Sequence, residues 1–358
     1  SAVGGQFTFK QTSTTPTADL NYVIYDFGKR KGDSEEARHE LIAANFSHDA
    51  EIQNVILQVQ QAYFQFVNAK ALAIAEKGAV ERSQADLDAA EQRHQAGVAT
   101  IADVLQAKTQ LSQAQLEFNR TEGAIEILRG VLAVAIGVPA SAAHLDVAEE
   151  LPENPPTDVV NQSVEELVKS AIAQRPDLAA ARSIALAARA HVGAVRGDNL
   201  PEISANGDVA RVHYWDTDAS VNTYAAQLLV TFPLFNGFAR KYDVREAQKL
   251  ADREDANVVV QSQQAGLEVW TDYYALQTAT LNIQTAKVLL ASAQQSYDVA
   301  QGRYKEGVGS ILDLLAAQNA LQDAKAQDVQ VRTNWYLALA QLTHDTGTLW
   351  KGSMGEKP

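Results

Sequence analysis

The stretches RHQAGVATIADVLQA (residues 93–107) and RYKEGVGSILDLLAA (residues 303–317) are two copies of one pattern, offset by 210 residues. Each copy reads Arg-x3-Gly-Val-x-[Thr/Ser]-x-x-Asp-x-Leu. The Arg and the Gly predict the end of a helix, because a cation is favoured in the last helical turn and glycine readily takes the left-handed conformation that ends one. The Thr or Ser, with Asp three residues later, predicts the capped start of the next helix. Each copy therefore predicts a tight tip between two helices.

The same offset relates residues far outside the two tips. Identical residues recur at this offset along the chain: Arg30 and Arg240, Tyr63 and Tyr273, Asp88 and Asp298, Leu132 and Leu342, Gly137 and Gly347. Internal repeats are sought before a chain length is divided into domains. We therefore expect a tandem duplication. The first structural repeat covers residues 1–137 and is N-terminally incomplete, a connector (equatorial segment) covers 138–175, the second repeat covers 176–350 and a tail covers 351–358.

The composition excludes several classes of protein. A formal net charge of −14 argues against a nucleic-acid partner, because the phosphate backbone would be repelled. The chain has no cysteine, so it has no disulfide and no thiolate metal site. It has no apolar run of 18 or more residues, as a spanning helix would need. Because its seven histidines lack HExxH-type spacing and no Walker A, GxGxxG or GxSxG motif occurs, we expect no enzymatic activity, no cofactor and no metal.

Two very long helices are predicted, over residues 29–96 and about 240–305. At a rise of 1.5 Å per residue each would be a rod of roughly 100 Å. Apolar residues in the two rods stand seven apart, a spacing typical of coiled coils: Leu57, Phe64 and Ala71 in the first, and Leu267, Tyr274, Leu281 and Val288 in the second. Shorter helices are expected over 100–136, 177–197 and 310–346. The fold class predicted from these elements is mainly α.

A small β portion is predicted from alternating segments near the start of each repeat. In the second repeat, residues 203–214 and 221–235 flank the polar loop WDTDAS. In the first, QFTFKQ at 6–11 and ADLNYVIYDFG at 18–28 flank TSTTPT, which is interpreted as a hairpin loop. Both copies place apolar side chains on one face: Leu20, Tyr22 and Ile24 in the first, and Tyr224, Leu228, Val230 and Phe232 in the second.

These alternating strands allow two interpretations. They can form a soluble hairpin that packs on the helices, or they can be transmembrane strands whose apolar face meets lipid. The alternation of apolar and polar residues does not by itself decide between these two interpretations.

The order of these features resembles the outer membrane efflux protein family, the TolC-like channel-tunnels. The resemblance rests on the doubled Arg-x3-Gly-Val tip, the long rods, Leu200-Pro201 before a strand and PLFNG at 233–237. It implies a homotrimer in which four strands per protomer join into one 12-stranded β-barrel in the bacterial outer membrane, while the helices form a trimeric α-barrel in the periplasm. The residues support several copies independently, because four strands cannot close a barrel and unpaired edges are costly in lipid.

The resemblance also implies roles for residues at the tips. A periplasmic adaptor (membrane fusion) protein would dock on Arg93, Gly97, Val98, Arg303, Gly307 and Val308. Asp103, Asp313 and Tyr304 would lie at a periplasmic gate, where rings of carboxylates filter cations. Asp103 and Asp313 also suit helix capping, and both roles can coexist.

The function implied is a passive conduit in a tripartite efflux or type I secretion system, coupled through the adaptor to an inner-membrane transporter. The alternative is a soluble coiled-coil scaffold or interaction protein whose hairpins cap the rods. The apolar strand faces favour the duct, and a detergent requirement would discriminate the two.

Overall fold

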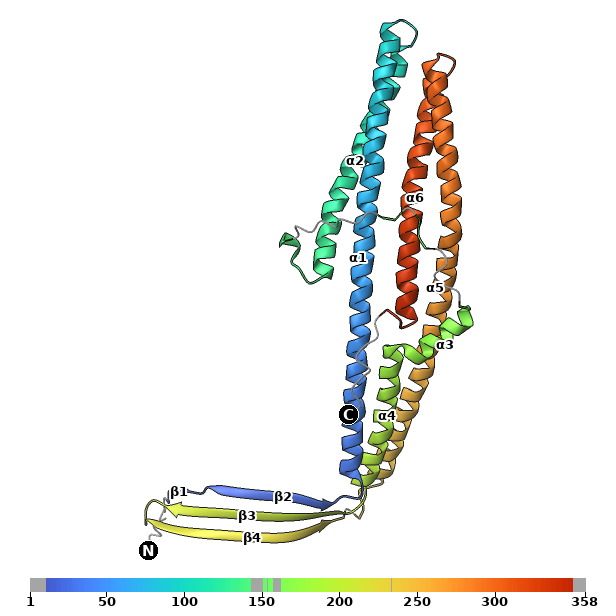
Figure 1. Ribbon diagram of the computed structural model, residues 1–358. Coiled ribbons are helices and arrows are strands. Elements are labelled where there is room, and N and C mark those ends of the chain that lie inside the picture. Colours follow the sequence, from blue (N-terminus) through green and yellow to red (C-terminus); the bar gives the residue numbers. More distant parts are fainter. Residues whose placement is uncertain (1–10, 143–150, 153, 157–161, 233, 350–358) are drawn as a thin grey trace, which may run out of the picture. The chain divides into compact units, whose positions relative to one another are not determined.

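The computed structural model describes residues 11–142, 151–152, 154–156, 162–232 and 234–349 (Figure 1). The chain divides into two compact units, each built from two stretches of sequence. Unit 1 comprises Ser1–Phe46 and Leu178–Gln261, and unit 2 comprises Ser47–Asp177 and Ser262–Pro358. Each unit therefore takes elements from both predicted repeats. The predicted tail at 351–358 lies outside the described residues.

Unit 1 contains an antiparallel sheet of four strands: β1 (Ser13–Thr14), β2 (Thr17–Tyr25), β3 (Glu202–Tyr214) and β4 (Ala219–Thr231). The strand β3 is central, with β4 on one side and both β1 and β2 on the other (Figure 1). The predicted hairpin of the second repeat is confirmed, and its turn is tightened to residues 215–218.

The prediction of a hairpin loop at residues 12–17 is wrong. Ser13 pairs with Tyr214 and Thr17 pairs with Ala210, so β1 and β2 keep one register along β3. Pro16 interrupts the strand because it has no N–H, but its carbonyl still accepts from the Arg211 N–H at 3.2 Å. An edge strand tolerates such a proline. Residues 6–10 of the strand predicted before it lie outside the described residues.

The helical part of unit 1 consists of α4 (Pro176–Asp198), the start of α1 (Lys29–Gln95) and the start of α5 (Ala239–Lys305). Small residues allow close approach here: Val192 packs against Ala247 and Ala251. A hydrogen bond of 2.8 Å joins His191 on α4 to Glu36 on α1.

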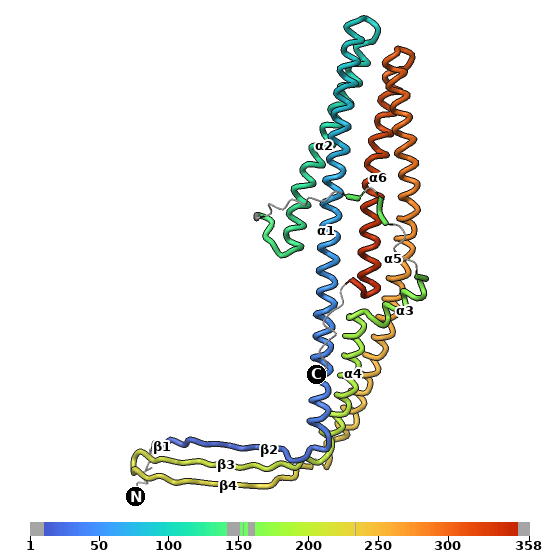
Figure 2. Tube along the Cα trace, viewed as in Figure 1, coloured from blue at the N-terminus to red at the C-terminus, as the bar shows by residue number. Residues whose placement is uncertain are grey.

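Unit 2 contains two helical hairpins (Figure 2). One is formed by α1 and α2 (Ile101–Ala135), and the other by α5 and α6 (Ile311–Asp345). A short 3-10 helix, η1 (Ala140–Ala142), follows α2, and α3 (Val164–Gln174) begins at the predicted cap Ser163. The four long helices and α4 agree with the sequence prediction to within about one residue at each end, which is the usual uncertainty of helix boundaries.

A buried cluster of unit 2 lies where α3 packs on α5 and α6. It includes Leu167, Val269, Leu276 and Trp335, and the Trp335 indole donates to Thr280 Oγ1 at 3.0 Å. Within the first hairpin, Ala90 of α1 packs with Ala107 of α2 in a separate buried cluster. The two aromatic groups on the rods, at 63–66 and 270–274, differ in burial. The first group includes the fully buried Phe66, whereas Trp270 and Tyr274 in the second are 46% and 43% exposed.

Candidate functional site

Both tips end their outgoing helix in the predicted way. Gly97 has φ +75° and Gly307 has φ +77°, the left-handed conformation that suits glycine. In the first tip the Val98 N–H donates to the Arg93 carbonyl at 3.0 Å, and in the second Val308 donates to Arg303 at the same distance. These are the bonds of a Schellman motif. The two tips therefore have the same backbone geometry.

The returning helices are capped by the predicted residues. Thr100 and Asp103 form a full capping box, in which Asp103 Oδ2 accepts from the Thr100 N–H at 2.8 Å. Ser310 Oγ accepts from the Asp313 N–H at 3.1 Å. The carboxylate of Asp313 also lines a groove of about 240 Å³ beside Arg303. The Asp103 carboxylate thus caps its helix, whereas at the second tip the cap is the Ser310 hydroxyl and Asp313 contributes only its N–H. The gate role of both carboxylates stays a prediction.

A contact between the two tips joins Arg93 to Tyr304. The Arg93 guanidinium donates from Nη1 to the Tyr304 carbonyl at 2.5 Å and lies over the Tyr304 ring, 4.8 Å from its centroid. That carbonyl also accepts the Gly307 N–H, so Arg93 sits at the negative end of α5. We call this contact the tip clamp. It brings together a residue predicted for docking and one predicted for the gate.

The Tyr304 side chain is buried, with 4% of its surface exposed. Burial raises the pKa of its hydroxyl. Among the described residues this hydroxyl has no hydrogen-bond partner. The tip clamp thus involves the ring and the main-chain carbonyl of Tyr304 but not its hydroxyl.

Exposed apolar side chains surround both tips. Val98 and Val308 are 64% and 69% exposed, as docking positions require. Three further residues beside them were missed by the sequence analysis: Ile101, Leu105 and Leu312. Their positions in the first turns of α2 and α6, directly after the tips, could have identified them from the sequence.

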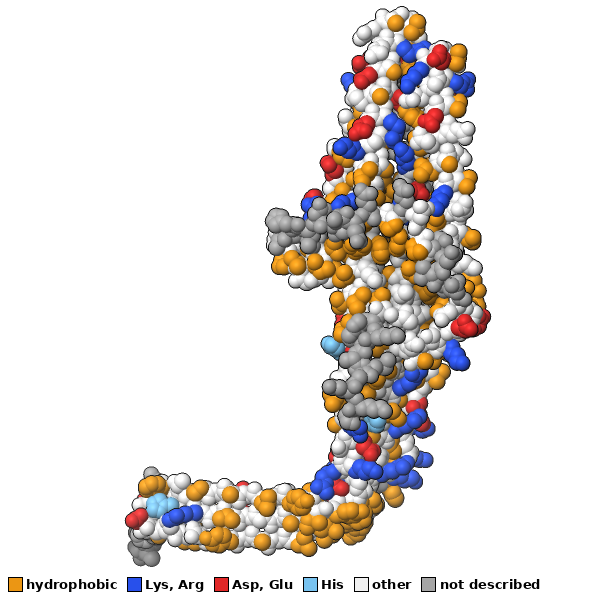
Figure 3. Space-filling view, viewed as in Figure 1, with side chains coloured by type: hydrophobic (Ala, Val, Ile, Leu, Met, Phe, Trp, Pro, Cys, Tyr) orange, Lys and Arg blue, Asp and Glu red, His pale blue; other side chains and the backbone are white. Residues whose placement is uncertain are grey.

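The sheet of unit 1 has one apolar and exposed face. Tyr22 pairs with Ala205, which pairs with Leu228, so all three point the same way. Leu20, Tyr224 and Val230 share this face because residues two apart along a strand do so. Their exposed fractions are large: Leu20 68%, Tyr22 60%, Tyr224 72%, Leu228 68% and Val230 59%. Figure 3 shows apolar side chains along the sheet.

Two residues predicted for that face are not assigned to it by pairing. Ile24 lies at a register shift, and Phe232 follows the end of β4. Both side chains are nevertheless exposed, at 45% and 49%.

The opposite face of the sheet is more polar, although Val23 and Leu229 also lie on it. Asn21 pairs with Asn206, which pairs with Gln227, and Asp19 pairs with Asp208 in the next row on this face. An apolar face backed by a polar one is the alternation of transmembrane barrel strands, which turn one face to lipid and the other to an aqueous lumen.

Polar contacts join the two hairpins of unit 2 below the tips. The Gln322 amide donates to Glu76 at 2.6 Å, and burial raises the pKa of Glu76. Nearer the tips, burial raises the pKa of Asp86 to about 6, although the positive charges of Lys305 and Arg82 oppose the shift.

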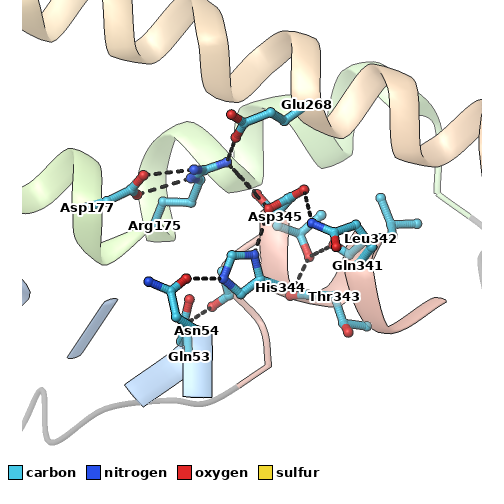
Figure 4. A network of polar contacts seen from close by, with 12 residues as sticks. Gln53, Asn54, Arg175, Asp177, Glu268, Gln341, Leu342, Thr343, His344 and Asp345 are labelled. Atoms are coloured by element: carbon cyan, nitrogen blue, oxygen red, sulfur yellow. Dashed lines mark hydrogen bonds and ion pairs between the residues drawn. The ribbon is translucent and has the colours of Figure 1, made fainter. Parts of the chain in front are cut away.

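A second polar network lies where α3 meets the end of α6 (Figure 4). Arg175 makes ion pairs with Asp177 and Glu268, at 2.7 and 2.6 Å. His344 lies 2.6 Å from a carboxylate oxygen of Asp345. Burial and a hydrogen bond with Asp345 raise the pKa of Asp272 to about 8. Two neighbouring carboxyl groups that cannot both ionise share one proton near neutral pH.

The described residues offer little for chemistry. Among them, no group of three or more His, Cys, Asp or Glu side chains is placed to hold a metal ion. Within the same part of the chain, no helix combines the length and apolarity needed to cross a membrane.

Comparison with known proteins agrees with this geometry. Protein CyaE of Bordetella pertussis is 26% identical over 333 residues, which cover 90% of this chain and 69% of CyaE. Outer membrane protein TolC of Salmonella enteritidis is 23% identical over 94% of this chain and 69% of its own length. The CmeC outer membrane channel of Campylobacter jejuni has a similar fold, with a TM-score of 0.83 at 19% identity over 97% of this chain and 79% of CmeC.

A sequence model described as "Outer membrane efflux protein" matches residues 1–138 and 167–348. This confirms the resemblance, the mainly helical fold with a small strand portion, and the location in the bacterial outer membrane. Because the match takes in most of the chain and the structure has the corresponding fold, the chain belongs to the outer membrane efflux protein family.

Proposed function

We propose that three copies of the chain close into one passive exit duct that crosses the outer membrane and extends into the periplasm. The observation that carries this is the sheet, whose exposed apolar face is backed by a polar one. Among the described strands, β2 and β4 each pair only with β3, so their outer edges are unpaired. In lipid such edges are prohibitively costly, and closure removes them.

Several copies are needed for closure, because a barrel requires about eight strands. Because β1 and β2 follow one another along the same edge of β3, they count as one interrupted strand. With the strand predicted at residues 6–11, each chain would then supply four strands, and three chains would supply twelve. Membership of the efflux family supports the same assembly. The polar face, with Asp19, Asn21 and Gln227, would then line an aqueous lumen.

The two tips of unit 2 would receive a periplasmic adaptor that couples the duct to an inner-membrane transporter. Support comes from their identical backbone geometry and from the exposed apolar side chains Val98 and Val308. Because the two tips present the same surface twice in each chain, they suit an adaptor that presents several copies of one helical hairpin.

The same end of the duct would carry its gate. Asp103 and Asp313 would form rings of carboxylates, and the tip clamp would hold the hairpins of one chain together when the gate is closed. Opening then requires the Arg93 guanidinium to leave the Tyr304 carbonyl. The clamp is therefore a latch within each chain.

Reconstitution into planar lipid bilayers tests the duct. The detergent-extracted protein should form stable ion-conducting pores. Extraction without detergent, together with an absence of conductance, would instead support the soluble coiled-coil scaffold.

Docking is tested in whole cells by cross-linking to the periplasmic adaptor. Val98→Asp with Val308→Asp should abolish the cross-link but leave conductance unchanged. Ile74→Asp is the matched control, because Ile74 is equally exposed (64%) on α1 but lies away from the tip. Equal capture by the docking variant and the control would refute tip docking.

A further inference from the structure

We propose that Asp86 of α1 and Gln318 of α6 form a proton-dependent latch below the tips, in which a proton taken up by the Asp86 carboxyl group favours the closed state of the gate. The inference rests on the gate of the proposed function and adds a residue and a signal that control it. Asp86 precedes Arg93 by two helical turns, so both lie on one face of α1, roughly 10 Å apart along its axis. The latch and the tip clamp thus share one seam, between α1 and the hairpin of α5 and α6.

Three buried polar side chains meet on this seam. Ser83, Asp86 and Gln318 are exposed by only 1%, 3% and 1%. One end of the Gln318 amide lies 2.8 Å from Asp86 Oδ2, and its other end lies 2.7 Å from Ser83 Oγ. Because a buried polar group without a hydrogen bond is costly, this set must be satisfied in each protonation state that it adopts.

The amide of Gln318 can satisfy both protonation states of Asp86. When Asp86 is ionised, the NH2 group donates to Asp86 Oδ2, and the amide oxygen accepts from the Ser83 hydroxyl at 2.7 Å. When Asp86 is protonated, its O–H donates to the amide oxygen, and the NH2 group donates to Ser83 Oγ. The two states differ by a half-turn of the amide. The site can therefore bind or release a proton without losing the bond between α1 and α6.

The charges around Asp86 come from α1 and α5. Arg82 and Lys305 favour the ionised carboxylate, but burial outweighs them and raises the pKa of Asp86 to about 6. Burial also raises the pKa of the Tyr297 and Tyr304 hydroxyl groups, and the nearby charge of Asp86 adds to both shifts. From α6 the facing group is the neutral amide already described. Since arginine, lysine and tyrosine ordinarily change charge well above neutral pH, Asp86 is the member of this cluster that titrates near neutrality.

The burial of Asp86 depends on the second hairpin. Ala89, about one turn further along α1, packs against the buried cluster that includes Tyr297 of α5 and Leu314 of α6. Gln318 also belongs to this hairpin. When the hairpins separate, water reaches the carboxyl group, and its pKa returns towards the ordinary value of about 4. A proton that binds more tightly in the closed state favours that state.

The pH window follows from these two pKa values. The closed-state pKa of Asp86 is the raised one, so its contribution to closure is complete below about pH 4 and is lost as the pH rises through about 6. From pH 7 to pH 5, the ratio of the closed to the open state should rise about ninefold per chain.

Single-channel recording in planar bilayers between pH 5 and pH 8 tests the latch. The open fraction of the wild-type channel should rise with pH, with most of the change between pH 5 and pH 7. Asp86→Asn keeps the size of the side chain and can bond to either end of the Gln318 amide, so this variant should fold but lose the pH dependence. The matched control is Asp88→Asn, which removes the same charge from an exposed position on α1 and should keep the pH dependence.

A second measurement follows the proton itself and does not depend on gating. Infrared difference spectra of the detergent-extracted protein, between pH 5 and pH 8, should contain the carbonyl band of a protonated carboxyl group that Asp86→Asn lacks and Asp88→Asn retains. Spectra without such a difference, or conducting channels in which both variants respond equally to pH, would overturn the latch and leave the duct intact. A protein that forms no pores at any pH would instead refute the duct itself, and the latch with it.

Discussion

Removal of the tip clamp should open the periplasmic end of the duct. The variant Arg93→Met keeps an unbranched side chain but loses the charge and the donors. It abolishes the bond from Nη1 to the Tyr304 carbonyl and the cation–π contact at 4.8 Å. It leaves the Gly307 N–H as the remaining donor to that carbonyl.

The size of the effect follows from the two contacts. A hydrogen bond from a charged group contributes about 1.5–3 kcal/mol. A cation–π contact contributes about 0.5–2 kcal/mol, depending on exposure. Because Arg93 is only partly buried and water solvates it again when the clamp opens, we expect a net loss of about 2–4 kcal/mol per chain. At about 1.4 kcal/mol per factor of ten, the closed state weakens about 30- to 700-fold.

Single-channel recording in planar bilayers is the assay. Arg93→Met should raise the open fraction or the mean conductance. Tyr304→Phe is the matched control: the Tyr304 hydroxyl has no partner among the described residues, whereas its ring and carbonyl remain, so this variant should behave like the wild type. Unchanged gating in Arg93→Met would refute the clamp. An open channel in Tyr304→Phe would show that the latch runs through the hydroxyl instead.

Three further predictions concern charge and membrane assembly. Asp103→Asn keeps a side-chain oxygen for its capping bond, and Asp313→Asn leaves the cap by Ser310 untouched, so folding of the double variant should be unchanged. Cation conductance and its block by divalent ions should fall, and unchanged recordings would refute the gate role of both carboxylates. The pKa of Asp272 is raised to about 8, above its unfolded value near 4. Its contribution to stability is therefore complete at acid pH and is lost as pH rises towards 8. Thermal unfolding of Asp272→Asn should thus show a Tm advantage over the wild type that grows from pH 5 to pH 8, and a constant difference would refute the shared proton. Leu228→Arg on the apolar sheet face should cost about 2–4 kcal/mol in membrane assembly, measured as the yield of folded protein in outer membranes, whereas the adjacent Gln227→Arg on the polar face should assemble normally.

The helices and both tips could be predicted because their signals are local. A helix cap such as Thr100 and a helix-ending glycine such as Gly97 act within one turn of the chain. Each of these patterns also occurs twice in the sequence, once in each repeat. Alternation likewise predicted the apolar sheet face. The loop at 12–17 was predicted wrongly because Pro16 usually marks a turn, and only pairing with β3 shows that the strand continues past it.

Contacts between hairpins could not be predicted, because they depend on tertiary packing. The tip clamp had one visible signal: the two repeats differ at the paired positions His94 and Tyr304. No sequence pattern pointed to the ion pairs of Arg175 with Asp177 and Glu268, because these charged residues lie far apart along the chain or in different elements. The apolar spacing on α5 predicted burial, yet Leu267, Tyr274, Leu281 and Val288 are all exposed in the single chain.

The central claim is that one chain supplies a third of a closed membrane duct. Native mass spectrometry of the complex released from outer membranes in detergent tests it most directly. We expect a single species with three times the mass of one chain, stable without added partners. A single chain that stays dispersed in water without detergent would contradict it.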